Sequence, residues 1–290
     1  MARRRPATVH GVVVVDKPAG VTSHDVVGMV RRRFGERRVG HAGTLDPDAT
    51  GVLVVGLGAA TRLLRFVGDG TKRYTGEVVL GVETDTLDAA GRVVARHDMA
   101  PIPIAEVRRV VAEHLVGEIE QVPPMVSALK VDGRRLHELA REGIEVERRP
   151  RPVRVDRFDV DETGEPGVLG IDVTCSTGTY IRSLAADLGR LLGGGAHLRR
   201  LRRTAVEPFT IDDARPVDEC EMLPVAAALR GLASTCVGAE AAAAVANGGF
   251  LPTPGGSGPW AVFDEDGELL AVYEAHPSGA AKPSVVLPTR

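Results

Sequence analysis

The chain has 290 residues, of which 43% are hydrophobic and 26% are charged. This is the composition of a globular protein with ample apolar material for a core, and it excludes a disordered chain. The formal net charge of -3 gives no global sign of nucleic-acid binding, but 32 of the 36 basic residues are arginines gathered in a few short segments.

The chain opens with a basic segment and a first apolar run at residues 11–15. That run is much shorter than a signal-peptide core or a membrane span, so we expect a cytoplasmic protein without a membrane contact. Further along, Cys175, Cys220 and Cys236 are odd in number and form no C-x-x-C pair. This spacing indicates reduced thiols, and we expect neither a metal nor a cofactor.

The first half of the chain alternates between strand and helix patterns. Residues 11–16 predict a buried strand, and a helix capped by Thr22 or Ser23 runs from there to Phe34. After a loop at residues 40–51, the patterns predict a strand at 52–57, a short helix at 61–66, a strand at 72–80, a turn at 81–91 and a helix at 104–115.

The second half is richer in strands. Strand patterns occur at residues 117–121, 154–160, 168–175 and 198–206, and they outnumber the helices between them. The fold class is therefore α+β, with a mixed, largely antiparallel central sheet flanked by helices.

A change of pattern marks the tail. From Gly231 onward an alanine-rich helix at 239–246 is followed by strand patterns at 260–264 and 269–274 around an Asp-Gly turn. We expect a principal domain over residues 1–230 and a small β module over 231–290.

The most unusual stretch is the loop at residues 38–51, in which small and turn-forming residues surround one histidine and two carboxylates. Such a loop cannot be a core element. Pro47 restricts the backbone of Asp46 to extended geometry and so helps to fix where that side chain points. By spacing alone, Asp46 is either a structural turn residue or a functional carboxylate, and Asp48 is an equal candidate.

Six motifs in order resemble those of TruB-type tRNA pseudouridine synthases, and together they cover nearly all of residues 11–206. They are GVVVVDKPAGVTSH (11–24), GHAGTLDP with ATGVL (40–53), KRY (72–74), QVPPM with SALK (121–130), GTYIR (178–182) and AHLRRLRR (196–203). The resemblance implies the pseudouridine synthase fold and a cofactor-free enzyme. It further implies that the enzyme converts uridine 55 in the T-loop of tRNA to pseudouridine by base flipping, without guide RNA or an obligatory protein partner.

The same resemblance assigns roles to individual residues. Asp46 corresponds to the nucleophile and Arg182 to its partner. The implied substrate-binding residues are His41, Tyr74, Tyr180 and Leu201, to which we add Lys17 and Lys130.

Physical chemistry makes these roles reasonable. Moving the base from N1 to C5 attachment needs a nucleophile but no redox step. A guanidinium would lower the pKa of a carboxylate that burial raises.

Arginines are expected to position the RNA, because guanidinium groups pair with phosphates without reading sequence. The candidates are Arg38, Arg134, Arg135, Arg202 and Arg203. Residues 130–152 resemble a thumb-like insertion that folds over the T-loop, although by composition alone they could form a solvated hairpin.

The tail resembles a shortened PUA-like RNA-binding module. It carries six acids and two basic residues, a net of -4, so we expect packing rather than phosphate binding to be its main role.

Two alternatives stay open. One is an RNA-binding or RNA-folding protein that captures a loop without turnover, and the other is the guide-RNA-dependent relative of archaea and eukaryotes. Loss of turnover with retained binding in an Asp46→Asn variant would separate the enzyme from the first. Activity on bare tRNA would exclude the second.

Overall fold

The computed structural model describes residues 6–127, 129–131 and 133–288. Its largest element is a nine-stranded sheet whose neighbouring strands are antiparallel except for β3 and β12, which are parallel. The strand order is β1 (Gly11–Lys17), β3 (Thr50–Leu57), β12 (Ala196–Val206), β4 (Lys72–Leu80), β11 (Val168–Cys175), β10 (Arg151–Glu162) and β7 (Gly117–Gln121). The mixed, largely antiparallel α+β class is confirmed.

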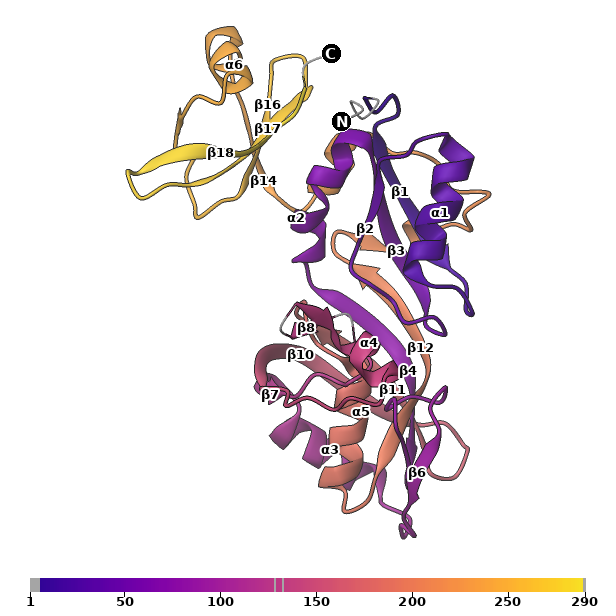
Figure 1. Ribbon diagram of the computed structural model, residues 1–290. Coiled ribbons are helices and arrows are strands. Elements are labelled where there is room, and N and C mark those ends of the chain that lie inside the picture. Colours follow the sequence, from indigo (N-terminus) through magenta and orange to yellow (C-terminus); the bar gives the residue numbers. More distant parts are fainter. Residues whose placement is uncertain (1–5, 128, 132, 289–290) are drawn as a thin grey trace.

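Helices cover the two ends of this long sheet (Figure 1). At one end, α1 (Ser23–Phe34) packs on β1 and β3 through Val26, Val27 and Val30. Its first turn is closed by a reciprocal capping box between Thr22 and Asp25. At the other end, α3 (Ile104–His114) and α5 (Ile181–Leu191) pack on β10 and β12 over a second apolar core. The strands β4 and β12 run between the two ends and connect them (Figure 1).

Several short elements differ from the prediction. The expected loop after residue 40 begins inside a strand, β2 (Val39–Ala42), which pairs with β3. The turn predicted at 81–91 contains the strand β5 (Val82–Thr84), which forms a small hairpin with β6 (Val93–Arg96). The helix expected at 61–66 is divided into a 3-10 turn, η1 (Gly58–Arg62), and α2 (Leu64–Gly68). These pieces have too few residues for their periodicity to be read from sequence.

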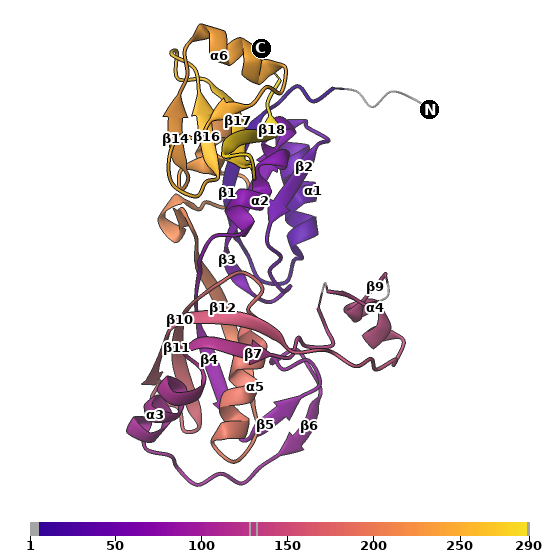
Figure 2. The same cartoon turned by 90° about the vertical axis from the view of Figure 1, so that its left-hand side faces the viewer.

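One segment projects from the sheet beside the loop that connects β2 to β3 (Figure 2). It contains β8 (Lys130–Val131), β9 (Arg134–Arg135) and α4 (Leu136–Arg141). Leu136 and Leu139 are buried, so the segment has a small apolar centre of its own.

The tail forms a second, five-stranded sheet in the order β14 (Ala233–Cys236), β16 (Trp260–Phe263), β17 (Leu269–Ala275), β18 (Ala280–Val286) and β15 (Leu251–Pro252), with α6 (Ala239–Ala246) beside it. Its core is built on Trp260 and Tyr273. The helix and both predicted strands are present, whereas the edge strands β14 and β15 and the seven-residue strand β18 had not been predicted.

The short strand β13 (Phe209–Thr210) pairs with β12 and completes the nine-stranded sheet together with β2. The 3-10 turns η2 (Ile211–Asp213) and η3 (Val225–Leu229) follow it in the chain before the tail sheet. Residues of η3 share an apolar cluster with Val272 and Val285 of the tail sheet. None of the helices in the described part of the chain is both long and apolar enough to cross a membrane.

Candidate active site

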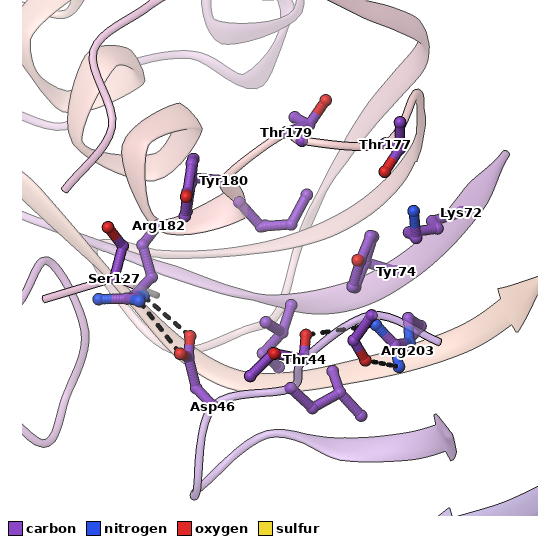
Figure 3. A pocket seen from close by; sticks show the side chains of 15 residues that line it. Thr44, Asp46, Lys72, Tyr74, Ser127, Thr177, Thr179, Tyr180, Arg182 and Arg203 are labelled. Carbon is purple, nitrogen blue, oxygen red and sulfur yellow. Dashed lines mark hydrogen bonds and ion pairs between the residues drawn. The ribbon is translucent and has the colours of Figure 1, made fainter. Parts of the chain in front are cut away.

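A cavity of about 250 Å³ opens where the β2–β3 loop, β4, β12 and the start of α5 meet. Asp46, Tyr74, Tyr180, Arg182 and Leu201 all line it, although they come from four separate parts of the chain. In Figure 3, Asp46 and Arg182 lie at one side of the cavity, while Tyr74, Lys72 and Arg203 lie at the other. The structure therefore brings together five of the residues to which sequence reasoning gave roles.

Arg182 on α5 forms an ion pair with the carboxylate of Asp46. The Nε of Arg182 lies 2.9 Å from Oδ2 of Asp46, and its Nη2 donates a hydrogen bond of 3.1 Å to Oδ1. Other donors of the same guanidinium bind the carbonyls of Thr86 and Val126, each at 2.9 Å. With 5% of its side chain exposed, Arg182 has little freedom to leave this position. A two-point contact of this kind fixes both distance and orientation.

A second carboxylate shares the guanidinium. Oδ2 of Asp88 lies 3.6 Å from Nε of Arg182. The pKa of Asp46 is raised above its ordinary value, chiefly because burial penalises the charged form, and Asp88 adds to the rise while Arg182 opposes it. Although 39% of the Asp46 side chain is exposed, that part faces the cavity. The Asp46 carboxylate is therefore more basic than an ordinary one, and its negative charge is paired with Arg182.

The loop that carries Asp46 is tied to the start of α1. The hydroxyl of Ser23 accepts from the amide of Leu45 at 2.8 Å and donates to the carbonyl of the same residue at 3.1 Å. The amide of Gly20 donates to the carbonyl of Pro47 at 3.0 Å. Asp48 is exposed and does not line the cavity. Of the two carboxylates that the sequence left open, only Asp46 faces the site.

Two tyrosines supply aromatic surface. Tyr74, on β4, is 7% exposed, and burial raises the pKa of its hydroxyl, which stays neutral. Tyr180, just before α5, is held through its backbone, because Gln121 accepts from its amide at 2.7 Å and donates to its carbonyl at 3.1 Å. The half-buried Leu201 adds an apolar wall. This is a lining suited to a flat heterocycle.

Two cations take places other than those expected. Lys17 is fully buried, and its Nζ donates to the carbonyls of Pro18, Val21 and Pro47 at 2.7–2.9 Å. All three of its donors are occupied, so Lys17 holds the loop that carries Asp46 and has no donor left for a substrate.

Arg203 likewise corrects an expectation. It is 1% exposed, and it donates to the carbonyls of Val52, Thr44 and Gly43 at 2.8–3.4 Å. A guanidinium this deeply buried does not contact the RNA backbone. It belongs to the wall of the cavity, and the arginine-rich motif gave no sign of which arginine points inward.

The other predicted residues are dispersed. His41, on β2, is half-buried and does not line the cavity, and burial lowers the pKa of its imidazole. Arg202 is paired with Asp16 at 2.8 Å. Arg134 is paired with Glu142, and Arg38 is exposed. The side chains of Lys130 and Arg135 lie outside the part of the chain that the structure describes.

Sequence reasoning missed several residues around the cavity. Asp88 lies in the Gly- and Asp-rich turn, which suggested only a turn. Lys72 opens the matched KRY triplet, where attention went to the tyrosine, and Gln121 opens another matched motif. Within the described residues, no group of three or more His, Cys, Asp or Glu side chains is arranged to hold a metal ion.

Three family models match the chain in succession. Residues 31–181 match the TruB family pseudouridylate synthase (N terminal domain). Residues 182–229 match the tRNA pseudouridylate synthase B C-terminal domain, and residues 232–288 match the tRNA pseudouridine synthase II, C terminal model.

Whole-chain comparisons agree with these models. The tRNA pseudouridine synthase B of Arthrobacter sp. (strain FB24) is 46% identical, over 95% of this chain and 96% of that protein. The one from Corynebacterium aurimucosum is 47% identical, over 93% of each. Among solved structures, a chain of an H/ACA RNP bound to a substrate RNA containing 2'-deoxyuridine has a TM-score of 0.73 at 26% identity, over 97% of this chain and 86% of that one. A chain of a Cbf5-Nop10-Gar1 complex has the same TM-score at 28% identity, over 97% and 84%.

The fold, the paired carboxylate and these matches define the class of protein: an RNA pseudouridine synthase, an isomerase that modifies tRNA. Within that class, the chain belongs to the TruB family, whose models cover it from residue 31 to residue 288 with a gap of two residues.

Proposed function

We propose that this enzyme converts uridine 55 in the T-loop of tRNA to pseudouridine, acting in the cytoplasm without guide RNA or an obligatory protein partner. The observation that carries the proposal is the carboxylate of Asp46, held at 2.9 Å by a buried arginine and facing a cavity lined by two tyrosines. The motifs around Asp46 and Tyr180 resemble those of enzymes that act at this position.

The reaction requires three changes of bonding. The bond between N1 of the base and C1′ of the ribose breaks, the base turns, and C5 becomes bonded to C1′. A proton leaves C5 and one is gained at N1, so substrate and product are isomers and no oxidant or reductant is consumed. Asp46 acts as the nucleophile that carries the intermediate, because a carboxylate with a raised pKa is a better nucleophile than an ordinary one.

A stacked base cannot reach the cavity, so the uridine must be flipped out of the loop. Unstacking costs a few kcal/mol, which aromatic contacts and hydrogen bonds within the pocket offset. Tyr74 and Leu201 offer faces for the base, and Tyr180 lies nearer to Asp46 and Arg182 (Figure 3). Arg182 keeps Asp46 ionised and aimed at the substrate.

RNA is positioned around this pocket by exposed arginines. Arg38 is exposed and available for phosphates, whereas Arg134 would have to exchange its pair with Glu142, and Arg202 its pair with Asp16, for a phosphate. The thumb-like segment at about 130–152 projects beside the β2–β3 loop that carries Asp46, as a cover for the T-loop would (Figure 2). We assign residues 1–230 to catalysis and residues 231–290 to a PUA-like module whose net charge of -4 favours packing over phosphate binding.

Independence from a guide is the finer part of the proposal. The solved relatives at 26% and 28% identity lie in an H/ACA RNP and in a complex with other proteins. The relatives at 46% and 47% identity carry the name tRNA pseudouridine synthase B. We take the function from the second group, since its similarity extends over almost the whole of both chains.

The test uses the purified chain alone with two tRNA transcripts labelled with tritium at C5 of uridine. We expect tritium release of about one equivalent from the natural transcript and none from a transcript with cytidine at position 55. Release that required an added protein or guide RNA would contradict independence. Release that persisted without uridine 55 would contradict the assigned position.

A further inference from the structure

The wall of the cavity opposite Asp46 contains two buried cations. Lys72, the first residue of β4, is 6% exposed, and Arg203 on β12 is 1% exposed. Both flank the backbone of Gly43, since a β-carbon placed there would lie 3.6 Å from Cε of Lys72 and 3.5 Å from Nη1 of Arg203. Both also line the cavity beside Tyr74 (Figure 3).

Neither cation forms an ion pair with any carboxylate among the residues that the structure describes. The charged and titratable groups that face Lys72 are Arg203, Cys175 and Asp69, together with Tyr74 on the same strand. Burial raises the pKa of the Cys175 thiol to about 11, so that group is neutral. Asp69 is exposed to water, which weakens its attraction. The protein interior around Lys72 and Arg203 therefore carries positive charge that no carboxylate among the described residues balances through an ion pair.

The donors of the two cations are used differently. The guanidinium of Arg203 donates hydrogen bonds to the carbonyls of Val52, Thr44 and Gly43, so Arg203 is part of the scaffold. Lys72 has three N–H donors, and within the described residues one of them has an acceptor, the carbonyl of Gly68 at 2.7 Å. Its remaining donors are available at the cavity wall.

A buried cation without a partner is costly, and desolvation together with the neighbouring Arg203 lowers the pKa of Lys72 to about 8. The same arrangement is favourable when an anion arrives, because a dry, fixed positive charge stabilises negative charge far better than water-exposed charge does. The opposite wall cannot serve this purpose, since Arg182 is already paired with Asp46.

We propose that Lys72, with Arg203 behind it, stabilises the negative charge that builds on the uracil base during the isomerisation. This inference rests on the proposed role of Asp46. If the carboxylate attacks C6, the π electrons of the C5–C6 bond move toward O4. If it attacks C1′, the electrons of the N1–C1′ bond stay on the departing base and spread over N1, O2 and O4. In either route a uracil oxygen becomes anionic, and an N–H donor of Lys72 meets it without transferring a proton. In the C1′ route the bond between Asp46 and C1′ breaks as C5 attacks C1′. In the C6 route the bond between Asp46 and C6 breaks when the C5 proton is lost. In both routes the carboxylate is released, and the base is neutral once the C5 proton has been replaced by one on N1.

The experiment compares Lys72→Met, Lys72→Arg and the wild type in single-turnover tritium release, with the enzyme in saturating excess over the tRNA. Lys282→Met, an exposed lysine on β18, is the matched control. We expect Lys72→Met to lower the rate constant roughly 100-fold, as loss of one such donor does elsewhere, while the dissociation constant for tRNA changes less than about threefold. Lys72→Arg should recover a large part of the rate, and Lys282→Met should behave as the wild type.

A pH profile separates this role from a purely structural one. Because the charged ammonium is the active form, the wild-type rate should fall as pH rises through about 8. The Lys72→Arg variant should keep its rate to higher pH, since a guanidinium stays protonated. A Lys72→Met variant that folds, binds tRNA and reacts at the wild-type rate would overturn the proposal. So would an alkaline limb that is unchanged in Lys72→Arg. An Asp46→Asn variant assayed alongside keeps the two ideas apart: if it is active, the proposed function fails, whatever Lys72 does.

Discussion

The two sheets of this protein differ in how many charged side chains they bury and in how tightly the backbone packs at the positions compared below. Around the cavity, Lys17, Arg182 and Arg203 are buried, and their donors hold backbone carbonyls or the carboxylate of Asp46. In the tail module the core is apolar, built on Trp260 and Tyr273, and most of the acids lie on the surface. Burying charge is unfavourable for folding, so its concentration in one region supports the proposal that the chemistry takes place there.

The same contrast holds for the backbone. Gly51 lies where β3 and β12 run in parallel, opposite Arg203 and next to Lys17 on β1. Its φ is +103°, and a β-carbon there would lie 2.1 Å from the carbonyl oxygen of Arg203. Gly267, in the turn between β16 and β17, also has a positive φ of +79°, but a β-carbon there would meet nothing within 4 Å. The backbone at Gly51 therefore has no room for a β-carbon, whereas the backbone at Gly267 has.

Gly51→Ala should therefore have the larger effect on stability. The added methyl group forces β3 and β12 apart, and the alanine must also adopt a left-handed backbone conformation. We expect the free energy of unfolding to fall by about 3 kcal/mol or more, and turnover to fall with it because Arg203 is displaced. Urea titration followed by circular dichroism measures the first effect, and tritium release measures the second.

Gly267→Ala should have the smaller effect. Only the conformational penalty applies, so we expect a loss of about 1 kcal/mol and an unchanged turnover. The fluorescence of Trp260, the single tryptophan, reports the tail module directly. Equal losses for the two variants would show that the strand contact at Gly51 is no tighter than an open turn.

Long elements could be predicted from the sequence because their patterns are local. β4, β7 and β11 have the predicted bounds, and Thr22 caps α1 as one of the two predicted candidates. Strands of two to four residues, such as β2 and β14, were missed because their pairing partners lie far away in the chain. The contact between Asp46 and Arg182 spans 136 residues, and only the family resemblance could suggest it.

Burial of charge was the part that sequence could not show. Arg202 and Arg203 are neighbours in an arginine-rich motif, yet the side chain of Arg202 is half-buried and paired with Asp16, whereas that of Arg203 is enclosed. Strand alternation separates the two side chains, but which one points inward depends on the neighbouring strands. Lys17 was expected to bind substrate but is fully buried, and its burial likewise depends on neighbouring elements that the sequence does not show.

The most direct test is single-turnover tritium release by Asp46→Asn with the enzyme in saturating excess over the tRNA, beside the wild type and with tRNA binding measured in parallel. The variant keeps the size of the side chain and removes the nucleophilic oxygen anion, so we predict no detectable release and near-normal binding. The wild-type rate should fall as pH falls through the raised pKa of Asp46, because the protonated carboxyl group cannot attack. An Asp46→Asn enzyme that released tritium at the wild-type rate would contradict the central claim.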